Sequence, residues 1–388
     1  MSPAIKIIFL GCMLIALLLR TGVAAANSLQ CGTWHHVPSP NPVPDPNTLY
    51  AGTALSMSNA WAVGVFQRPR TTLGSFVEPL IEHWDGTQWS LIPSPIFLAS
   101  NAYLQDISAI TANDVWAVGG ELTYPFQTLI EHWDGSSWSV VPSPSPGTGD
   151  NYLSGVAAVT STDVWAVGHY ANQFSNNQTL MEHWDGTRWS VVQSPSHASV
   201  NNDLTAVAAV SSNDIWAAGY TTDGTKQTLI EHWDGTQWSL IPSPNPGQLL
   251  SYLYGLTTIS SSDVWAVGSF FSSSGTNRGQ TLIEHWNGTT WSVVSSPSPG
   301  GDNNVLQAVT SLSATNIWAV GILVKTRESP IQTLIEHWDG ATWSIVPSPN
   351  PGISNWLYGV MASAGNHIWA VGNYSDPKTK TLVESYCQ

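Results

Sequence analysis

A segment of about fifty residues recurs through this chain, and one copy of it is split between the two termini. In a complete copy, Asp114–Gly119 is followed by a loop, then by Gln127–Gly135, and then by Trp138–Pro144. The last copy reaches Glu384 and breaks off at the C-terminus, and its missing part stands at residues 31–40. A repeat that begins at one terminus and finishes at the other is typical of a closed ring.

Each copy contains four short runs of Val, Ile, Leu, Thr and Trp, bounded by Gly, Asn, Asp, Ser and Pro. The runs are too short for helices, and Asp-Gly pairs between the third and fourth runs indicate hairpins. Four antiparallel strands repeated radially make one propeller blade. The sequence therefore predicts an all-β, seven-bladed propeller over 27–388. Its last blade would combine 355–388 with an N-terminal strand at 31–40, which closes the ring.

The cysteines agree with this closure. Aligned on the repeat, Cys31 and Cys387 both fall at the Asp of the Asp-Gly hairpin, whereas Cys12 precedes the first repeat. Two cysteines that meet where the other blades have a turn predict a disulfide between Cys31 and Cys387. Two unpaired thiols are the alternative.

Residues 1–26 resemble a secretory signal peptide, with Lys6, an apolar run over 7–19, and Ala24–Ala26 as a cleavage site. No other segment is apolar and long enough to span a membrane. Export and a disulfide both indicate an oxidising compartment. We therefore expect a secreted or cell-surface protein without a membrane span, and a monomer.

Composition excludes one class of partner. Residues 27–388 contain nine Lys and Arg against 26 Asp and Glu, so nucleic-acid binding is not expected. Of the 21 tryptophans, 20 stand at repeat positions and one, Trp356, does not. Because every blade has the repeated tryptophans, we interpret them as packing between blades.

The repeat resembles the kelch-type, galactose-oxidase-like propellers in the order of Val118-Gly119-Gly120, Trp133-Asp134 and Trp138. The Asp-Gly-Thr-x-Trp element is also similar to part of the Asp-box of sialidase-like propellers. The resemblance covers residues 27–388 and implies the fold, not the function. Most blades have one Gly where kelch repeats have two, and no catalytic residue is carried over.

No pattern for a nucleophile, a phosphate loop or a zinc site is present, so no metal or cofactor is expected. The repeated Glu-His pair cannot chelate one metal, because neighbours on a strand point to opposite faces. We expect a structural role, in which each Glu faces the adjacent blade and hydrogen-bonds its His or a Trp indole. Ser385 replaces His in the last blade, so this belt should break there.

Variation between copies indicates where a ligand binds. Two kinds of turn are short and uniform, whereas the loops after the second run and the residues before the first run differ between blades. Eight of the nine basic residues lie in these loops. The candidate binding residues are Trp356, Tyr252, Tyr152, Tyr103, Arg68, Arg70, Arg278, Arg327 and Tyr124. Solvated loops that collect cations, and aromatics that plug the channel, are the alternatives.

The preferred function is an exported, non-catalytic binding module for a glycan or a protein. The alternatives are a polysaccharide hydrolase or lyase acting at the same channel mouth, and a structural cell-surface protein. A cluster of two or three acids at the mouth would favour the enzyme, and Asp106, Asp203 and Asp302 are the acids near it.

Overall fold

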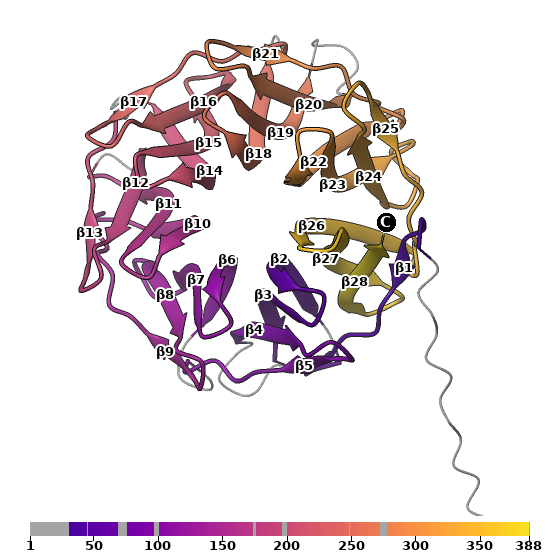
Figure 1. Cartoon of the computed structure of the whole chain (residues 1–388), viewed down its shortest axis with the longest axis horizontal. Coiled ribbons are helices and arrows are strands. Elements are labelled where there is room, and N and C mark those ends of the chain that lie inside the picture. Colours follow the sequence, from indigo (N-terminus) through magenta and orange to yellow (C-terminus); the bar gives the residue numbers. More distant parts are fainter. Residues whose placement is uncertain are drawn as a thin grey trace, which may run out of the picture.

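The chain forms a ring of small sheets around a central channel (Figure 1). The structure, a computed structural model, describes residues 31–44, 46–68, 76–96, 101–173, 176–195, 200–247, 249–271 and 278–387. These residues form strands β1 to β28, which pair in fours as seven antiparallel sheets. One parallel pairing, between Lys226 and Leu250, joins the sheets of blades four and five. The seven-bladed propeller predicted from the repeat is confirmed.

The first strand of each blade lines the channel, and the second strand packs beside it (Figure 1). The innermost strands are β2 (Asn47–Ser56), β6 (Ala102–Thr111), β10 (Asn151–Thr160), β14 (Asn201–Ser211), β18 (Leu250–Ser260), β22 (Asn303–Ser313) and β26 (Ser354–Ser363). The second strands are β3 (Asn59–Gln67), β7 (Asp114–Glu121), β11 (Asp163–Ala171), β15 (Asp214–Thr222), β19 (Asp263–Phe271), β23 (Asn316–Val324) and β27 (His367–Ser375).

The third and fourth strands complete each blade toward the rim. The third strands are β4 (Val77–Trp84), β8 (Gln127–Trp133), β12 (Asn177–Trp184), β16 (Lys226–Trp233), β20 (Gly279–Trp286), β24 (Gln332–Trp338) and β28 (Thr379–Cys387). The outer strands are β5 (Trp89–Leu91), β9 (Trp138–Val140), β13 (Trp189–Val191), β17 (Trp238–Leu240), β21 (Trp291–Val293), β25 (Trp343–Ile345) and β1 (His35–His36). The described residues contain no helix that could cross a membrane.

The N-terminal strand β1 closes the ring. It pairs antiparallel with β28, so the last sheet has the order β1-β28-β27-β26. The predicted Cys31–Cys387 disulfide joins this strand to the C-terminus. Trp34 then packs 5.6 Å from Trp318 of blade six, edge to face. The split blade therefore packs on its neighbour as Trp138 of blade two packs on Trp61 of blade one.

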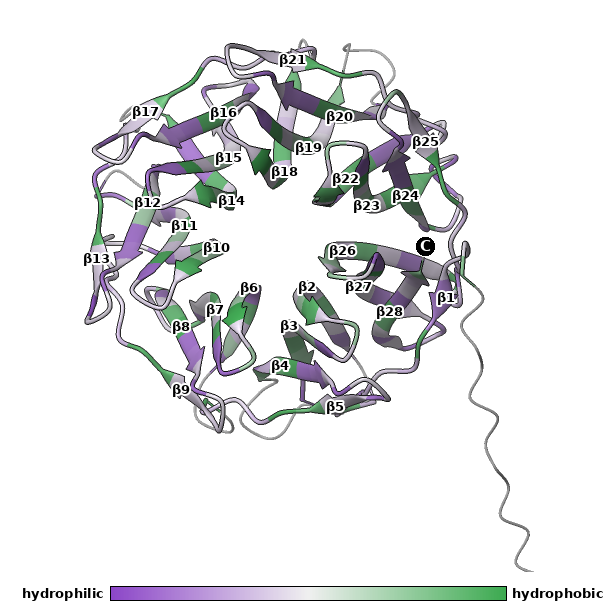
Figure 2. Cartoon of the chain, viewed as in Figure 1, coloured by the Kyte–Doolittle hydropathy of each residue, from purple (hydrophilic) through white to green (hydrophobic). Residues whose placement is uncertain are grey.

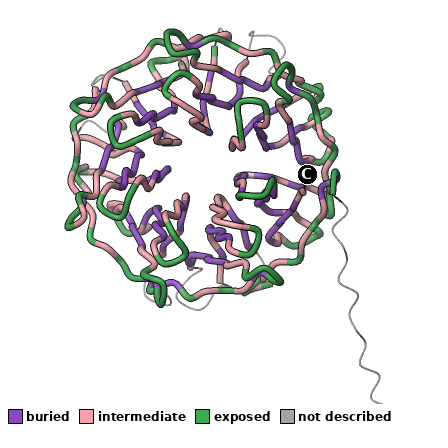
Figure 3. The backbone as a smooth tube through the Cα atoms, in the orientation of Figure 1, coloured by how far each residue is buried: buried purple, intermediate pink, exposed green. Residues whose placement is uncertain are grey.

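The core lies between the blades. Trp61 of blade one packs against Trp133 and Trp138 of blade two, with ring centroids 5.1 and 5.5 Å apart. Seven such clusters of described residues occur, one at each junction between neighbouring blades. Figure 3 shows the buried strands inside the ring and the exposed turns at its edges. The repeated tryptophans therefore form the inter-blade core, as their pattern predicted.

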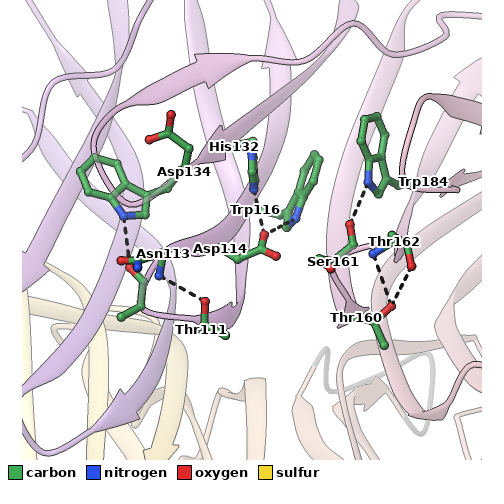
Figure 4. A network of polar contacts seen from close by, with 12 residues as sticks. Thr111, Asn113, Asp114, Trp116, His132, Asp134, Thr160, Ser161, Thr162 and Trp184 are labelled. Carbon is green, nitrogen blue, oxygen red and sulfur yellow. Dashed lines mark hydrogen bonds and ion pairs between the residues drawn. The ribbon is translucent and has the colours of Figure 1, made fainter.

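The Glu-His pairs lie on the third strands, where Figure 2 shows hydrophilic segments inside the ring. His132 donates to Asp114 at 2.8 Å, and the Trp116 indole donates to the same carboxylate at 3.0 Å (Figure 4). Glu131 instead accepts from the Ser94 hydroxyl of the preceding blade at 2.7 Å. The expected Glu-to-His or Glu-to-indole bond was therefore wrong. Glu131 and His132 point to opposite faces of the strand. The Glu face meets the preceding blade, and the His face, with Trp116, meets the next blade.

The belt changes in blade seven. The position of Asp114 is taken by His367 there, and the position of His132 by Ser385. Neither side chain of this pair has a hydrogen-bond partner. The His-to-Asp hydrogen bond of blade two therefore has no counterpart in blade seven, where Ser385 replaces the histidine.

Candidate functional site

An open cavity of about 720 Å³ lies on the variable-loop face, across blades two, three and four. We call it the mouth pocket. It is lined by Tyr124, Pro125, Thr148, Gly149, Asp150, Tyr152, His169, Ala171, Asn177, Asp203 and Tyr220. These residues come from the loops after the second strands and from the first residues of the inner strands, which is where variation between repeats predicted a ligand.

The repeat itself positions these side chains. The first residues of β10 pair with the last residues of β11, so that Tyr152 lies opposite His169. Gly168 precedes His169 and lies opposite Leu153, and a Cβ at Gly168 would clash with the carbonyl oxygen of Tyr152. The inner strand can approach the second strand only because this residue is glycine. The invariant glycine of the repeat therefore fixes the wall from which the variable residues project.

His169 and Asp203 form the polar centre of the mouth pocket. The Nδ1 of His169 lies 3.2 Å from the Asp203 carboxylate, and the Asn177 amide donates to the same carboxylate oxygen at 2.7 Å. The Tyr152 ring packs on the imidazole, with centroids 4.8 Å apart. Burial lowers the pKa of His169, and the charges of Asp203 and Asp150 offset part of this effect. The imidazole is therefore neutral at neutral pH.

Asp150 organises the loop wall of the pocket. Its carboxylate accepts from the backbone amide of Phe126 at 2.9 Å, which ties the β7–β8 loop to the start of blade three. The neighbouring Asn151 side chain donates to the carbonyls of Phe126 and Gly149 at 3.0 and 2.9 Å. These bonds fix the loop at Phe126, two residues after Tyr124. Tyr124 itself is 97% exposed.

A cation lies beside the pocket on blade four. The Lys226 ammonium stands 4.7 Å from the ring centre of Tyr220 and 4.8 Å from that of Tyr252. The two rings are themselves edge to face at 5.1 Å. Burial, followed by the Asp203 and Tyr252 charges, raises the pKa of Tyr220 to about 12. Tyr220 is thus a neutral hydroxyl at the pocket edge, and Lys226 is held against aromatic faces.

The structure brings only part of the predicted set together. Tyr124 and Tyr152 line the mouth pocket, and Tyr252 contacts it through Tyr220. Tyr103, with a pKa that burial raises, lies beside Gly120 on blade two and does not line the pocket. Trp356 is half-buried at the start of β26, in blade seven.

The predicted arginines do not gather at the mouth pocket. Arg68 forms an ion pair with Glu78 at 2.5 Å and lines a separate, mainly apolar cavity of blade one. Arg278 is exposed before β20. Arg327, with a side chain that is 77% exposed, lies 4.0 Å from Asp302. Arg70 falls outside the described residues.

Several polar residues of the pocket were absent from the predicted set, among them Asp150, His169 and Asn177. A signal for His169 was available in the sequence, because the residue after the glycine of the second strand differs in every blade. These residues are Val65, Gly120, His169, Tyr220, Ser269, Ile322 and Asn373. The two acids named from sequence with Asp203 lie elsewhere, since Asp106 lines the central channel and Asp302 lies near Arg327.

Comparison with known proteins identifies the fold of this chain. No family model and no curated protein matches the chain. Among solved structures, YCF48 bound to a D1 peptide is 14% identical, with a TM-score of 0.57 over 93% of this chain and 96% of that one. An ulvan lyase, of a polysaccharide lyase family and bound to a saccharide of glucuronic acid and sulfated rhamnose, is 10% identical, with a TM-score of 0.53 over 91% and 95%. This chain is a β-propeller. At these identities the likeness establishes the fold alone.

Proposed function

We propose that this propeller is an exported binding module that holds a neutral glycan in the mouth pocket. The observation that carries the proposal is the lining of that pocket. Three tyrosines, Tyr124, Tyr152 and Tyr220, surround carboxylate, amide and imidazole groups that the repeat does not require. Flat aromatic faces with a few fixed hydrogen-bonding groups are what a sugar ring needs for orientation and contact area.

Charge selects among glycans. The described residues that line the mouth pocket include Asp150 and Asp203 but no Lys or Arg. An anionic uronate or sulfate would meet two carboxylates in the lining, whereas the nearby cation Lys226 lies outside it, against the Tyr220 and Tyr252 rings, so the contact is unfavourable. A neutral sugar can donate its hydroxyl groups to those carboxylates and accept from the amide of Asn177. We therefore expect a neutral glycan as the ligand. The experiment described below also tests for a peptide ligand.

The proposed setting outside the cell rests on two features. The Cys31–Cys387 disulfide is typical of oxidising compartments, and residues 1–26 have the pattern of a signal peptide. We also keep the kelch-type relationship as a proposal, supported by the order of its glycine, aromatic-Asp and Trp positions.

A glycan array probed with the mature protein tests the binding proposal. Binding to neutral glycans that is lost in Tyr124→Ala and kept in Asp234→Ala would support it, since Asp234 lies in an exposed turn of a third-to-fourth-strand hairpin. Absence of glycan binding, or binding that Tyr124→Ala leaves unchanged, would contradict it. A parallel peptide array identifies a peptide ligand if that is the true class.

A polysaccharide-cleaving enzyme is the second candidate, and the His169–Asp203 pair favours it. A neutral imidazole next to a carboxylate can accept a proton from water or from an acidic carbon of a sugar. Incubation with a polysaccharide panel, followed by assays for new reducing ends and for unsaturated products, tests this activity. Turnover that His169→Ala abolishes would establish the enzyme, and its absence across the panel would leave the binding module.

A further inference from the structure

The central channel contains a second cavity, of about 290 Å³, which the proposed glycan site does not use. Each blade contributes to it the residue that follows the buried leucine of its inner strand. These seven residues are Tyr50, Gln105, Ser154, Thr205, Tyr254, Gln307 and Tyr358. All of them have a hydroxyl or an amide. The wall of the channel therefore offers hydrogen-bonding groups in every direction around its axis.

Asp106 occupies the next position of the inner strand in blade two, and it is the one residue there that departs from the repeat. The equivalent residues of the other six blades are Ala51, Gly155, Ala206, Gly255, Ala308 and Gly359. The position is crowded, because a Cβ on Gly255 would lie 2.9 Å from the Cα of Ala308 in the next blade. The small residues thus follow from the close approach of neighbouring inner strands, and a carboxylate in blade two needs another explanation.

The carboxylate of Asp106 is held at the channel wall. The backbone amide of Val156, in the next blade, donates to it at 2.8 Å. Burial raises the pKa of Asp106 to about 7, and the backbone amides of Val156 and Ile107 partly oppose this effect. Among the described residues that line the channel there is no Lys or Arg. Removing a carboxylate from water without a cationic partner costs free energy that Ala or Gly would not cost.

Aromatic and apolar groups complete the cavity. The Tyr50 and Tyr358 rings meet edge to face at 5.8 Å on neighbouring blades. Burial raises the pKa of Tyr50, Tyr254 and Tyr358, so their hydroxyls stay neutral. Apolar side chains of the following position lie beside them, at Val207, Leu256, Val309 and Val360. The channel therefore combines one carboxylate, neutral acceptors, aromatic rings and an apolar wall.

We propose that the channel binds a primary ammonium group on a short apolar stem, with Asp106 as its counter-ion. An ammonium has three donors and no acceptor, so it matches a wall of carboxylate, hydroxyl and amide oxygens. Tyrosine faces also attract cations. An anion would find no cation in the lining, and a neutral ligand would leave the charge of Asp106 uncompensated. The cavity volume fits a small amine or a lysine side chain of a partner.

This proposal stands independently of the glycan proposal, because the lining of the channel and that of the mouth pocket share no residue. Isothermal titration of the mature protein with n-butylammonium is the test, and n-butanol and butyrate are the neutral and anionic controls. Titration with Nα-acetyl-lysine methylamide asks whether a lysine side chain serves as the ligand. We expect saturable binding of one butylammonium per chain and none of the two controls.

Two variants connect that binding to Asp106. Asp106→Asn keeps the shape and removes the charge, and Asp106→Ala installs the residue that the repeat uses elsewhere. Each is expected to weaken butylammonium binding about tenfold or more, which corresponds to the loss of an ion pair with a partly desolvated carboxylate. Both should fold, and thermal melting checks this. Equal affinity in the wild type and both variants, absence of saturable binding, or a loss of binding in Tyr124→Ala instead would overturn the proposal.

Discussion

Cys31 and Cys387 are bonded across a sequence separation of 356 residues, at the place where the other six blades have a continuous hairpin. Gly32 has a φ of 90°, and the hairpin glycine Gly86 has a φ of 95°. The amide of Gly32 also donates to the carbonyl of Cys387 at 2.8 Å. The disulfide therefore stands in place of one peptide connection of the turn, and Gly32 keeps the positive φ of the hairpin glycines.

Loss of this closure should open the ring. Deletion of residues 27–40 removes β1, Trp34 and the disulfide together, which leaves β28 as an unpaired edge. The truncated protein is expected to melt at a lower temperature and to aggregate. Cys31→Ser separates the effects, because it keeps β1 and removes a cross-link worth about 5 kcal/mol in the chain-entropy model. Melting of the truncated protein at the wild-type temperature would contradict the role of β1.

The histidine belt should support stability and not binding. His232 donates to Asp214 at 2.8 Å and packs on Trp216 with ring centres 4.2 Å apart. His232→Ala removes both contacts and is expected to destabilise the fold by about 1–3 kcal/mol in chemical denaturation. Arg188→Ala, at a side chain that is 80% exposed, is the control and should change little. Unchanged stability of His232→Ala together with lost ligand binding would refute the structural role.

The buried glutamates should make stability fall as pH rises. Glu182 is fully buried, neither of its oxygens has a hydrogen-bond partner, and burial raises its pKa from 4.5 to about 8. The folded chain therefore holds this proton more tightly than the unfolded chain. The resulting stabilisation is complete below the unfolded pKa and is lost as the pH rises to about 8.

Glu182→Gln tests this effect, because the amide has the same shape and does not ionise. The variant is expected to match the wild type near pH 5 and to exceed it by about 2–4 kcal/mol near pH 9, as measured by denaturant unfolding at both values. Glu328→Gln changes an exposed residue and serves as the control. The histidines with lowered pKa, such as His83, act in the opposite direction but equally in all three proteins. A Glu182→Gln variant without extra stability at high pH would show that Glu182 is not a buried acid.

The fold could be predicted from the sequence because the repeat supplies seven internal comparisons. The positions of Trp116 and Gly119 recur in every blade, so their roles in packing and close approach follow from the pattern. The split copy at residues 31–40 similarly determined how the ring closes. The partner of Glu131 could not be predicted, because Ser94 belongs to the preceding blade and its approach depends on blade packing, not on residue order.

For the binding site, the sequence predicted only the face of the ring on which it lies. Variation between repeats located the loops, and Tyr124 and Tyr152 were identified because aromatic side chains are distinctive there. His169, Asn177 and Asp203 come from three different strands. His169 and Asp203 meet where blade three contacts blade four, as Asn373 and Thr48 do where blade seven contacts blade one, and such contacts between blades are not visible in residue order. Arg68 illustrates the reverse case, since Glu78 neutralises a cation that appeared available in sequence.

Substitutions at the mouth pocket should separate two locations for the ligand. Tyr124→Ala removes an exposed ring, and Asp203→Asn removes a charge that lies next to His169 and Asn177. Stacking on an aromatic ring contributes about 1–3 kcal/mol by analogy with base stacking, so Tyr124→Ala should weaken binding of the array-identified glycan roughly ten- to a hundredfold. Titration calorimetry measures the affinity, and melting temperatures should stay close to the wild-type value.

Trp356→Ala and Asp85→Ala complete that experiment. Trp356 belongs to blade seven, away from the blades that line the mouth pocket, and Asp85 lies in an exposed turn between β4 and β5. Both variants should bind the glycan as the wild type does if the ligand lies across blades two to four. If Trp356→Ala abolishes binding while Tyr124→Ala and Asp203→Asn have no effect, the ligand lies on blade seven. In that case Trp356, the tryptophan that the repeat does not require, is the binding residue.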